Sequence, residues 1–328
     1  MGCPPPGHFL CIHKQHRDAA ACTLARRHPV FLLPFYQPSP FSPPVECPSD
    51  EEIRRIVQVA LAEDIGGGDV TSLAIVPESA QARASMAARE ALVVAGLPVV
   101  GEVFRQVSSE LAVHREAEDG EKVRGGEILL RVAGPARPIL TAERVALNFV
   151  QRLSGVATLT RQFVDAIEGT HARILDTRKT TPGLRSLEKY AVACGGGTNH
   201  RFGLFDQVLI KDNHLSALSN ARPNAIAAAV RLARENAPGR IVEVEADTLV
   251  QVEEAVDAGA DVILLDNMNL VQLRLAVQQA KGRAKTEASG GISLGSARRV
   301  AETGVDYISV GGLTHSARAM DIALDFEI

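Results

Sequence analysis

The sequence contains no tryptophan, and only 4% of its 328 residues are Phe, Trp or Tyr. Proteins that bind single-stranded nucleic acid without sequence preference stack bases on aromatic rings within a broad basic surface. Neither condition is met, since 35 Lys and Arg residues are balanced by 39 Asp and Glu residues. We therefore expect no nucleic-acid partner.

Long hydrophobic runs are also missing. A membrane-spanning helix needs about 20 consecutive apolar residues, and stretches such as ALVVAGLPVV reach roughly half of that length. Because 46% of the residues are hydrophobic, the chain can still bury a sizeable core in one large or two modest domains. We expect no membrane partner.

Cysteine is scarce, and four of the five cysteines lie in residues 1–48 together with ten of the 17 prolines and four of the nine histidines. This composition predicts a disordered tail. A metal site in the tail is not favoured, because there is no CxxC pair or regular zinc spacing. The residues that such a site would use are Cys3, His8, Cys11, His13, His16, Cys22 and His28.

Cys194 is then the one cysteine in the predicted folded region, which excludes a disulfide framework and favours a reducing compartment. We accordingly predict a cytoplasmic location. Arg26, Arg27 and the apolar run HPVFLLPFY leave organelle targeting by the tail as an alternative. An over-extended start of translation is a second alternative.

Folded structure is predicted to begin at Ser49, which together with Glu52 forms a capping-box pattern before an amphipathic helix. Short strands follow, and a long helix, TAERVALNFVQRLSGVATLTRQFVDAIEG, connects this part to the next. We predict an α+β domain at residues 49–150 and an α/β domain at 151–315. Residues 316–328 are expected to form a C-terminal helix that joins the first domain.

The second domain alternates strands and helices, which predicts a parallel sheet. Periodicity alone does not distinguish a barrel from an open sheet. All six strands end in polar or glycine residues, and a barrel gathers all its strand ends around one mouth. This observation favours a barrel. The strands are RILD, QVLIK, RIVEVEA, DVILLD, KTEASGG and YISVGG.

Positive charge is concentrated between residues 173 and 214, where seven Lys and Arg and two His face four acids, although the net charge of the chain is −4. A basic cluster among turn residues indicates a ligand with several anionic groups. The candidate residues are Arg178, Lys179, His200, Arg201 and Lys211. Lys179 or Lys211 acting as a Schiff-base nucleophile is the alternative interpretation.

Two glycine pairs, Gly290 with Gly291 and Gly311 with Gly312, each lie between a strand and a helix. Their backbone amides favour phosphate binding, with Ser289 and His315 as further donors; tight turns alone are the simpler explanation. Glu245 and Asp266 end neighbouring strands, where carboxylates hold Mg²⁺ or sugar hydroxyls. Glu243 lies two residues before Glu245, so the two side chains point to the same face of the strand and either could face the site. Alternatively, these acids only pair with nearby Lys or Arg residues at the rim of the cavity.

Several of these segments resemble the quinolinate phosphoribosyltransferase family over residues 50–328. The motifs are TAERVALNFVQRLSGVAT, the block from ILDTRKTTPGLR to IKDNH, VEVEADTL, VILLDNM, EASGGI and DYISVGGLTHS. The resemblance implies transfer of phosphoribose from phosphoribosyl pyrophosphate to quinolinate with decarboxylation, in NAD biosynthesis. The expected fold class is α/β, with an N-terminal α+β open sandwich followed by an incomplete (β/α) TIM-like barrel.

The resemblance also implies residue roles. Lys179, Lys211, Glu245 and Asp266 would be catalytic, and Mg²⁺ would be held by Glu245 and Asp266, largely through the substrate pyrophosphate. Quinolinate would contact Arg144, Arg178, Lys179, His200, Arg201 and Lys211. Phosphoribosyl pyrophosphate would contact Glu245, Asp266, Ser289, Gly290, Gly291, Gly311, Gly312 and His315. Arg144 would reach the partner's site in a homodimer with shared active sites.

Three alternatives stay open at this point. A related phosphoribosyltransferase acting on nicotinate or on a molybdenum-transport-associated acceptor would share the architecture. A lyase using a barrel lysine is a second possibility. The hairpin EDGEKVRGGEILLRVAGP resembles lipoyl or biotinyl carrier modules, but it lacks a lysine at its tip, so we interpret it as structural.

Overall fold

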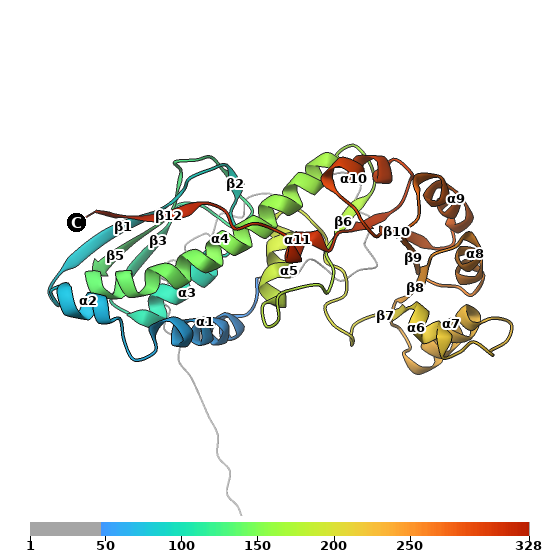
Figure 1. Cartoon of the computed structure of the whole chain (residues 1–328), viewed down its shortest axis with the longest axis horizontal. Coiled ribbons are helices and arrows are strands. Elements are labelled where there is room, and N and C mark those ends of the chain that lie inside the picture. The colour runs from blue at the N-terminus through green and yellow to red at the C-terminus, as the bar shows by residue number, and fades with distance from the viewer. Residues whose placement is uncertain (1–46, 328) are drawn as a thin grey trace, which may run out of the picture. The chain divides into compact units, whose positions relative to one another are not determined.

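The computed structural model describes residues 47–327 (Figure 1). The metal and targeting hypotheses for the tail therefore lie outside the described residues, which include only its last two positions, Cys47 and Pro48. Within the described range, no helix combines the length and the apolar content needed to cross a membrane. The cytoplasmic location and the absence of nucleic-acid partners stay predictions.

Helix α1 (Asp50–Ile65) begins where the sequence predicts, because Ser49 Oγ accepts a hydrogen bond from Glu52 N at 3.3 Å. The acids of the first turn also complement the positive end of the helix dipole. A second, short helix, α2 (Val70–Ile75), begins after Asp69, whose carboxylate accepts from Ser72 N at 3.0 Å. The two helices belong to the N-terminal domain.

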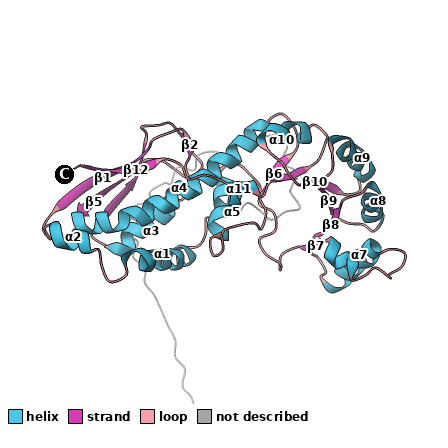
Figure 2. Ribbon diagram, in the orientation of Figure 1, coloured by secondary structure: helices cyan, strands magenta, loops and turns pink. Residues whose placement is uncertain are grey.

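A four-stranded antiparallel sheet forms the other layer of this domain. Its order is β12 (Ile322–Glu327), β1 (Gln81–Ala88), β5 (Ile128–Pro135) and β3 (Ala112–Arg115). Helices lie on one face of the sheet (Figure 2), and β2 (Leu92–Val93) pairs with β4 (Lys122–Val123) beside it. The predicted α+β open sandwich is confirmed.

Helix α3 (Leu97–Val107) was not anticipated, because the segment around it was predicted to contain strands. Its valines favour strands by propensity, yet Pro98 stands in the first turn, where a helix tolerates proline. Leu97, Val100 and Phe104 are fully buried at helical spacing. Packing of this face against α1 and α4 therefore overrides the local propensity.

Helix α4 (Ala136–Ala166) contains 31 residues and runs from the first domain into the second. It packs against β1, β5 and β12 at one end and against α5 (Arg185–Cys194) and β6 (Arg173–Leu175) at the other. Ser154 Oγ accepts from Ala95 N at 3.1 Å near the middle of the helix. One rigid element thus contributes to both cores.

The second domain contains a six-stranded sheet with parallel pairing throughout. Its order is β6, β11 (Tyr307–Ser309), β10 (Lys285–Ser289), β9 (Val262–Asp266), β8 (Val242–Ala246) and β7 (Val208–Ile210). The end strands β6 and β7 do not pair with each other in the described part of the chain, so the barrel is incomplete, as expected.

Helices cover the outside of this curved sheet (Figure 1). They are α6 (Asp212–Ser216), α7 (Ala225–Asn236), α8 (Leu249–Asp257), α9 (Leu270–Ala280) and α10 (Leu294–Ala301). All six strands that the sequence predicts are present. The alternation of β and α segments sends each strand in the same direction, because every return passes through a helix.

The prediction of a helix at residues 316–328 is wrong. After α11 (Gly312–His315) the chain runs back to the first domain and forms β12, which pairs antiparallel with β1 from Arg83↔Glu327 to Ala88↔Ile322. The segment IALDFE alternates, with Ile322 and Leu324 buried on one side. Alternate residues of this segment are buried at the edge of a sheet, and this pattern, rather than an apolar stripe at helical spacing, determines that it forms a strand.

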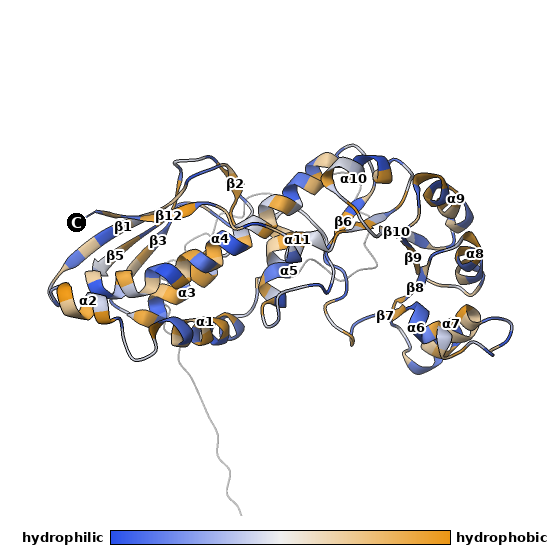
Figure 3. Cartoon of the chain, viewed as in Figure 1, coloured by the Kyte–Doolittle hydropathy of each residue, from blue (hydrophilic) through white to orange (hydrophobic). Residues whose placement is uncertain are grey.

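Helix α2 leaves apolar side chains in solvent. Val70, Leu73 and Ile75 are 79%, 57% and 74% exposed, and this short helix is coloured mostly as hydrophobic in Figure 3. Thr141 Oγ1 bonds the N-cap carboxylate of α2 at 3.2 Å, so the patch adjoins α4. Exposed apolar patches of this kind are common where proteins bind other molecules.

Gly155 provides a test of how tightly α4 packs. A Cβ at this position would lie 1.9 Å from the backbone oxygen of Arg318. We expect Gly155→Ala to lower the free energy of unfolding by about 1–3 kcal/mol through overpacking, although alanine is the better helix former. Gly67→Ala, where no atom lies within 4 Å, is the control in urea titrations. Equal stability of both variants would contradict this packing.

Candidate active site

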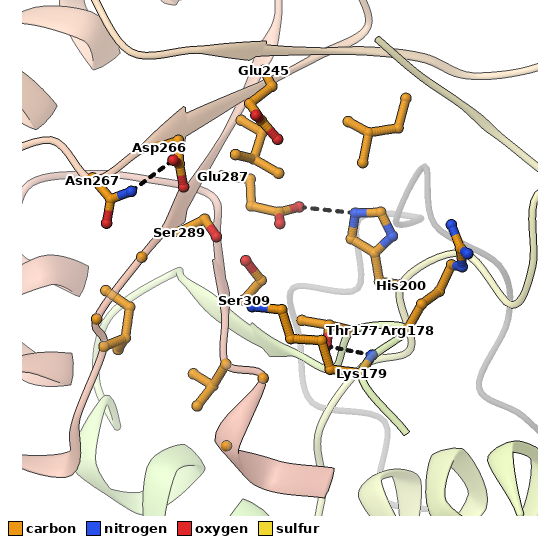
Figure 4. A pocket seen from close by; sticks show the side chains of 18 of the residues that line it. Thr177, Arg178, Lys179, His200, Glu245, Asp266, Asn267, Glu287, Ser289 and Ser309 are labelled. Carbon is orange, nitrogen blue, oxygen red and sulfur yellow. Dashed lines mark hydrogen bonds and ion pairs between the residues drawn. The ribbon is translucent and has the colours of Figure 1, made fainter. Parts of the chain in front are cut away.

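A cavity of about 720 Å³ opens at the carboxyl ends of the parallel strands (Figure 4). Every strand of the sheet, or the loop after it, contributes to the wall. The polar residues of the lining are Thr177, Arg178, Lys179, His200, Arg201, Lys211, Glu245, Asp266, Asn267, Glu287, Ser289, Ser309 and His315, with Gly290, Gly291, Gly311 and Gly312. Every predicted site residue except Arg144 lies here.

One side of the cavity is basic, and a buried carboxylate holds its backbone. Asp176, at the end of β6, accepts from Lys189 Nζ at 2.5 Å, from Asn199 Nδ2 at 2.6 Å and from His200 N at 2.9 Å. Lys189 also donates to His200 O at 2.9 Å. Asp176, Lys189 and Asn199 are fully buried, so this network fixes the segment that carries His200 and Arg201.

A second buried carboxylate, Glu188, supports the loop that carries Lys179. It accepts from Thr181 N at 2.9 Å and from Arg152 Nη2 at 2.7 Å. Arg152 also donates to Ala317 O at 2.7 Å, and Thr314 Oγ1 donates to Lys179 O at 2.8 Å. The loops after β6 and β11 are thereby connected to α4.

The opposite side is acidic. Sheet register places Glu245 beside Leu264, and Asp266 lies two residues further on, so both acids face the interior. Glu245 forms an ion pair with Lys211, and Asp266 accepts from Asn267 Nδ2 at 2.7 Å. Both are oxygen ligands of the kind that Mg²⁺ prefers. The carboxylates therefore stand across the cavity from the arginines.

Glu243 and Glu245 have different environments, which the sequence left open. Glu245 lines the cavity, whereas Glu243 is fully buried beneath it. Burial, reinforced by the nearby charge of Glu287, raises the pKa of Glu243 to about 7. Burial opposes a charge on His200, but Glu287 and Glu243 outweigh it and raise its pKa.

At the mouth of the cavity, Gly290 and Gly311 lie close to neighbouring side chains. Gly290 has a φ of +95°, and a Cβ there would lie 2.1 Å from Asn267 Oδ1. At Gly311 a Cβ would lie 3.1 Å from Lys179 Cδ and 3.2 Å from His315 Nε2. A side chain at Gly290 would clash with Asn267 and strain the backbone, so glycine is required there, whereas a side chain at Gly311 would require Lys179 and His315 to shift slightly.

Glu287 and Ser309 also line the cavity and were not selected from the sequence, whereas Thr177 and Asn267 lie at the polar strand ends that predicted the site but were given no role. The period-2 rule was the available signal for Glu287, because it precedes Ser289 by two residues on the same strand. Arg144 is exposed on α4, away from the cavity of its own chain. Its predicted contact with quinolinate therefore requires a second subunit.

Comparisons with known proteins agree with this architecture. The family model for the N-terminal domain of quinolinate phosphoribosyl transferase matches residues 69–154, and that for the C-terminal domain matches 156–325. The chain is 47% identical to the nicotinate-nucleotide pyrophosphorylase (carboxylating) of Mycobacterium leprae, covering 83% of this chain and 96% of that one. It is 42% identical to a probable enzyme of the same name from Bacillus subtilis, with 84% and 93% covered.

A solved structure is similar as well. The nicotinate-nucleotide pyrophosphorylase from Francisella tularensis superposes with a TM-score of 0.82 at 38% identity, covering 88% of this chain and all of that one. The similarity thus includes both domains and the strand ends that form the cavity.

The buried pair of Lys189 and Asp176 allows a stability test. Lys189→Met leaves Asp176 buried without its partner, and we expect a loss of about 3–5 kcal/mol in the free energy of unfolding. The double variant Lys189→Met with Asp176→Asn should recover part of that loss, because no uncompensated charge remains. Lys285→Met is the control, since its partner Asp306 and Lys285 itself are partly exposed. If Lys189→Met unfolds like this control in urea, the network is not structural.

Proposed function

The chain belongs to the quinolinate phosphoribosyltransferase family, and on that premise we propose that it transfers phosphoribose from phosphoribosyl pyrophosphate to quinolinate. The products are nicotinate mononucleotide, pyrophosphate and carbon dioxide, in the de novo synthesis of NAD. The observation that carries the proposal is that one cavity gathers two arginines, two lysines, carboxylates and two glycine loops. Lys211 pairs with Glu245, and Lys179 lies against Gly311, so the lysines connect the arginines to the acidic and glycine-rich part of the wall. A lysine lyase explains the lysines but not the paired glycine loops.

Quinolinate occupies the basic side in this proposal. Arg178 Nε is buried and donates no hydrogen bond within the described residues, so a ligand carboxylate supplies its missing acceptor. Arg201 is only 8% exposed, and a guanidinium sheltered from water binds carboxylate strongly. Lys179 and Lys211 add positive charge. Two carboxylates on one pyridine ring match this set better than the single carboxylate of nicotinate.

Phosphoribosyl pyrophosphate occupies the other side. Glu245 and Asp266 accept hydrogen bonds from ribose hydroxyls, and the 5′-phosphate lies against the backbone amides of Gly290, Gly291, Gly311 and Gly312 with Ser289 and His315. Glu245 and Asp266 also suit Mg²⁺, because both are carboxylates open to the cavity. When bound, Mg²⁺ neutralises charge on the leaving pyrophosphate.

The reaction is then largely electrostatic. The bond from ribose C1′ to the pyrophosphate oxygen breaks, and both electrons leave with pyrophosphate while the ring nitrogen of quinolinate bonds to C1′. Carboxylates of the cavity stabilise the positive charge that develops on the ribose, and the lysines stabilise the leaving group. The pyridinium nitrogen then stabilises the electron pair left by departing carbon dioxide, and a solvent proton takes its place.

A homodimer completes the site. Arg144 lies one helical turn from Thr141, which bonds the N-cap of α2, so the arginine and the exposed apolar face of α2 lie close together on the N-terminal domain. A second copy that covers this face brings Arg144 to the basic end of its partner's cavity. This arrangement gives an exposed arginine a role in binding the acceptor.

One assay tests the function directly. Purified protein with Mg²⁺ and phosphoribosyl pyrophosphate should release carbon dioxide from quinolinate and form nicotinate mononucleotide, and should turn over nicotinate poorly. The reason is that one carboxylate leaves at least one guanidinium unpaired. Preference for nicotinate, or trapping of a borohydride-stable adduct on Lys179 or Lys211, would overturn the assignment.

Arg144→Ala tests the shared site. We expect turnover to fall by about 100-fold or more, as for loss of a sheltered charge-assisted contact, with an unchanged melting temperature. Arg299→Ala, another exposed arginine on a helix, is the control and should remain active.

Mixing subunits sharpens this test. Arg144→Ala and Lys211→Ala homodimers should both be inactive, whereas a refolded mixture should regain about a quarter of wild-type activity, because half of the dimers are mixed and each holds one intact site of two. A mixture without activity would mean that each chain completes its own site.

A further inference from the structure

Two buried carboxylates lie directly beneath the basic end of the cavity. Glu243 on β8 and Glu287 on β10 each precede a residue of the upper wall, Glu245 and Ser289, by two positions. Both are fully buried. Both also approach the same atom, His200 Nε2, at 3.0 Å from Glu243 Oε2 and 3.4 Å from Glu287 Oε2 (Figure 4 shows the contact to Glu287).

This arrangement is unfavourable for the stability of the fold. Two carboxyl groups stand together without solvent, and Glu243 Oε1 and both carboxyl oxygens of Glu287 accept no hydrogen bond from the described residues. Well-packed apolar residues in place of buried charges are often neutral or stabilising. A buried acidic pair at this depth therefore points to a role in the site above it.

The contacts from Glu243 lead to Arg201 by two routes. Glu243 Oε2 accepts from Gln207 Nε2 at 2.7 Å, and Gln207 O accepts from Arg201 Nη1 at 3.4 Å. On the other route, His200 bonds Glu243 through Nε2, and its Nδ1 accepts from Arg201 N at 2.7 Å. Both the backbone and the guanidinium of Arg201 are thus held by groups that contact Glu243.

Both ring nitrogens of His200 are engaged inside the protein in this arrangement. Nε2 lies 3.0 Å from Glu243 Oε2 and 3.4 Å from Glu287 Oε2, and Nδ1 lies 2.7 Å from Arg201 N. His200 therefore connects both acids to the backbone of Arg201.

We propose that Glu243 and Glu287 are positioning residues of the acceptor site, which hold His200 and Gln207 and thereby orient Arg201 toward a carboxylate of quinolinate. The inference rests on the proposed function, because it names quinolinate as the ligand of Arg201. The acceptor site then includes buried side chains that contact its lining residues from the protein interior. The side chains that these acids contact, His200 and Gln207, belong to the acceptor side, so the acids act on the acceptor rather than on phosphoribosyl pyrophosphate.

Glu243→Gln is the first test, since the amide keeps the shape and removes the charge. We expect KM for quinolinate to rise by about 10-fold, as for loss of an outer-layer partner, while KM for phosphoribosyl pyrophosphate changes less than about twofold. The melting temperature should not fall, because a like-charge contact is removed. Glu102→Gln, at a buried carboxylate paired with Arg105 in the N-terminal domain, should leave both KM values unchanged.

A double-mutant cycle tests the route through Arg201. If Glu243 acts through this arginine, Glu243→Gln combined with Arg201→Lys should bind quinolinate about as weakly as Arg201→Lys alone. Additive effects, or equal rises in both KM values, would overturn the proposal. Glu287→Gln gives the same test if Glu243→Gln fails to fold. Wild-type protein that does not turn over quinolinate would instead refute the proposed function.

Discussion

The buried carboxylate of Asp176 is the contact on which the active site depends. It ends β6 and gathers Lys189, Asn199 and the backbone of His200 around one charge, with no exposed atom among the three side chains. These residues come from a strand, a helix and a loop, so one ion pair aligns three separate segments. Because the charges are shielded from water, their attraction is not screened by salt. The basic wall is therefore preorganised before any ligand arrives.

The cavity is built in two layers with different functions. The upper layer, which includes Glu287, lines the cavity, and the lower layer holds Glu243 and Asp176, which are fully buried and contact His200. Catalysis of a charge-separating reaction requires fixed dipoles and charges rather than flexible ones. Buried acids are unfavourable for folding, and a continuous hydrophobic core that includes residues of both domains provides the stability that offsets them.

Helix α4 contributes to this core in both domains. Its first half covers the antiparallel sheet, and its second half carries Arg152, which donates hydrogen bonds to Glu188 and to the carbonyl of Ala317, shortly after the Gly311–Gly312 pair. The return of the chain as β12 binds the end of the second domain back to the first. The N-terminal domain thus braces the catalytic domain, and in the proposed dimer it also supplies Arg144 to the partner.

Much of this was predictable from local patterns. The six strands, the long helix and the cap at Ser49 follow from periodicity and capping chemistry, and the polar strand ends identified nearly all the cavity residues, because parallel strands bring their carboxyl ends to one edge. Helix α3 was not identified from the sequence, the C-terminal segment was wrongly predicted to be a helix, and the choice between Glu245 and Glu243 stayed open. Those outcomes depend on which face a distant element covers. Local sequence therefore determined the secondary-structure elements and the polar residues at their ends. Tertiary packing decided which of these residues are buried, because burial depends on distant elements. It leaves Glu245 facing the cavity and buries Glu243 against His200 and Gln207.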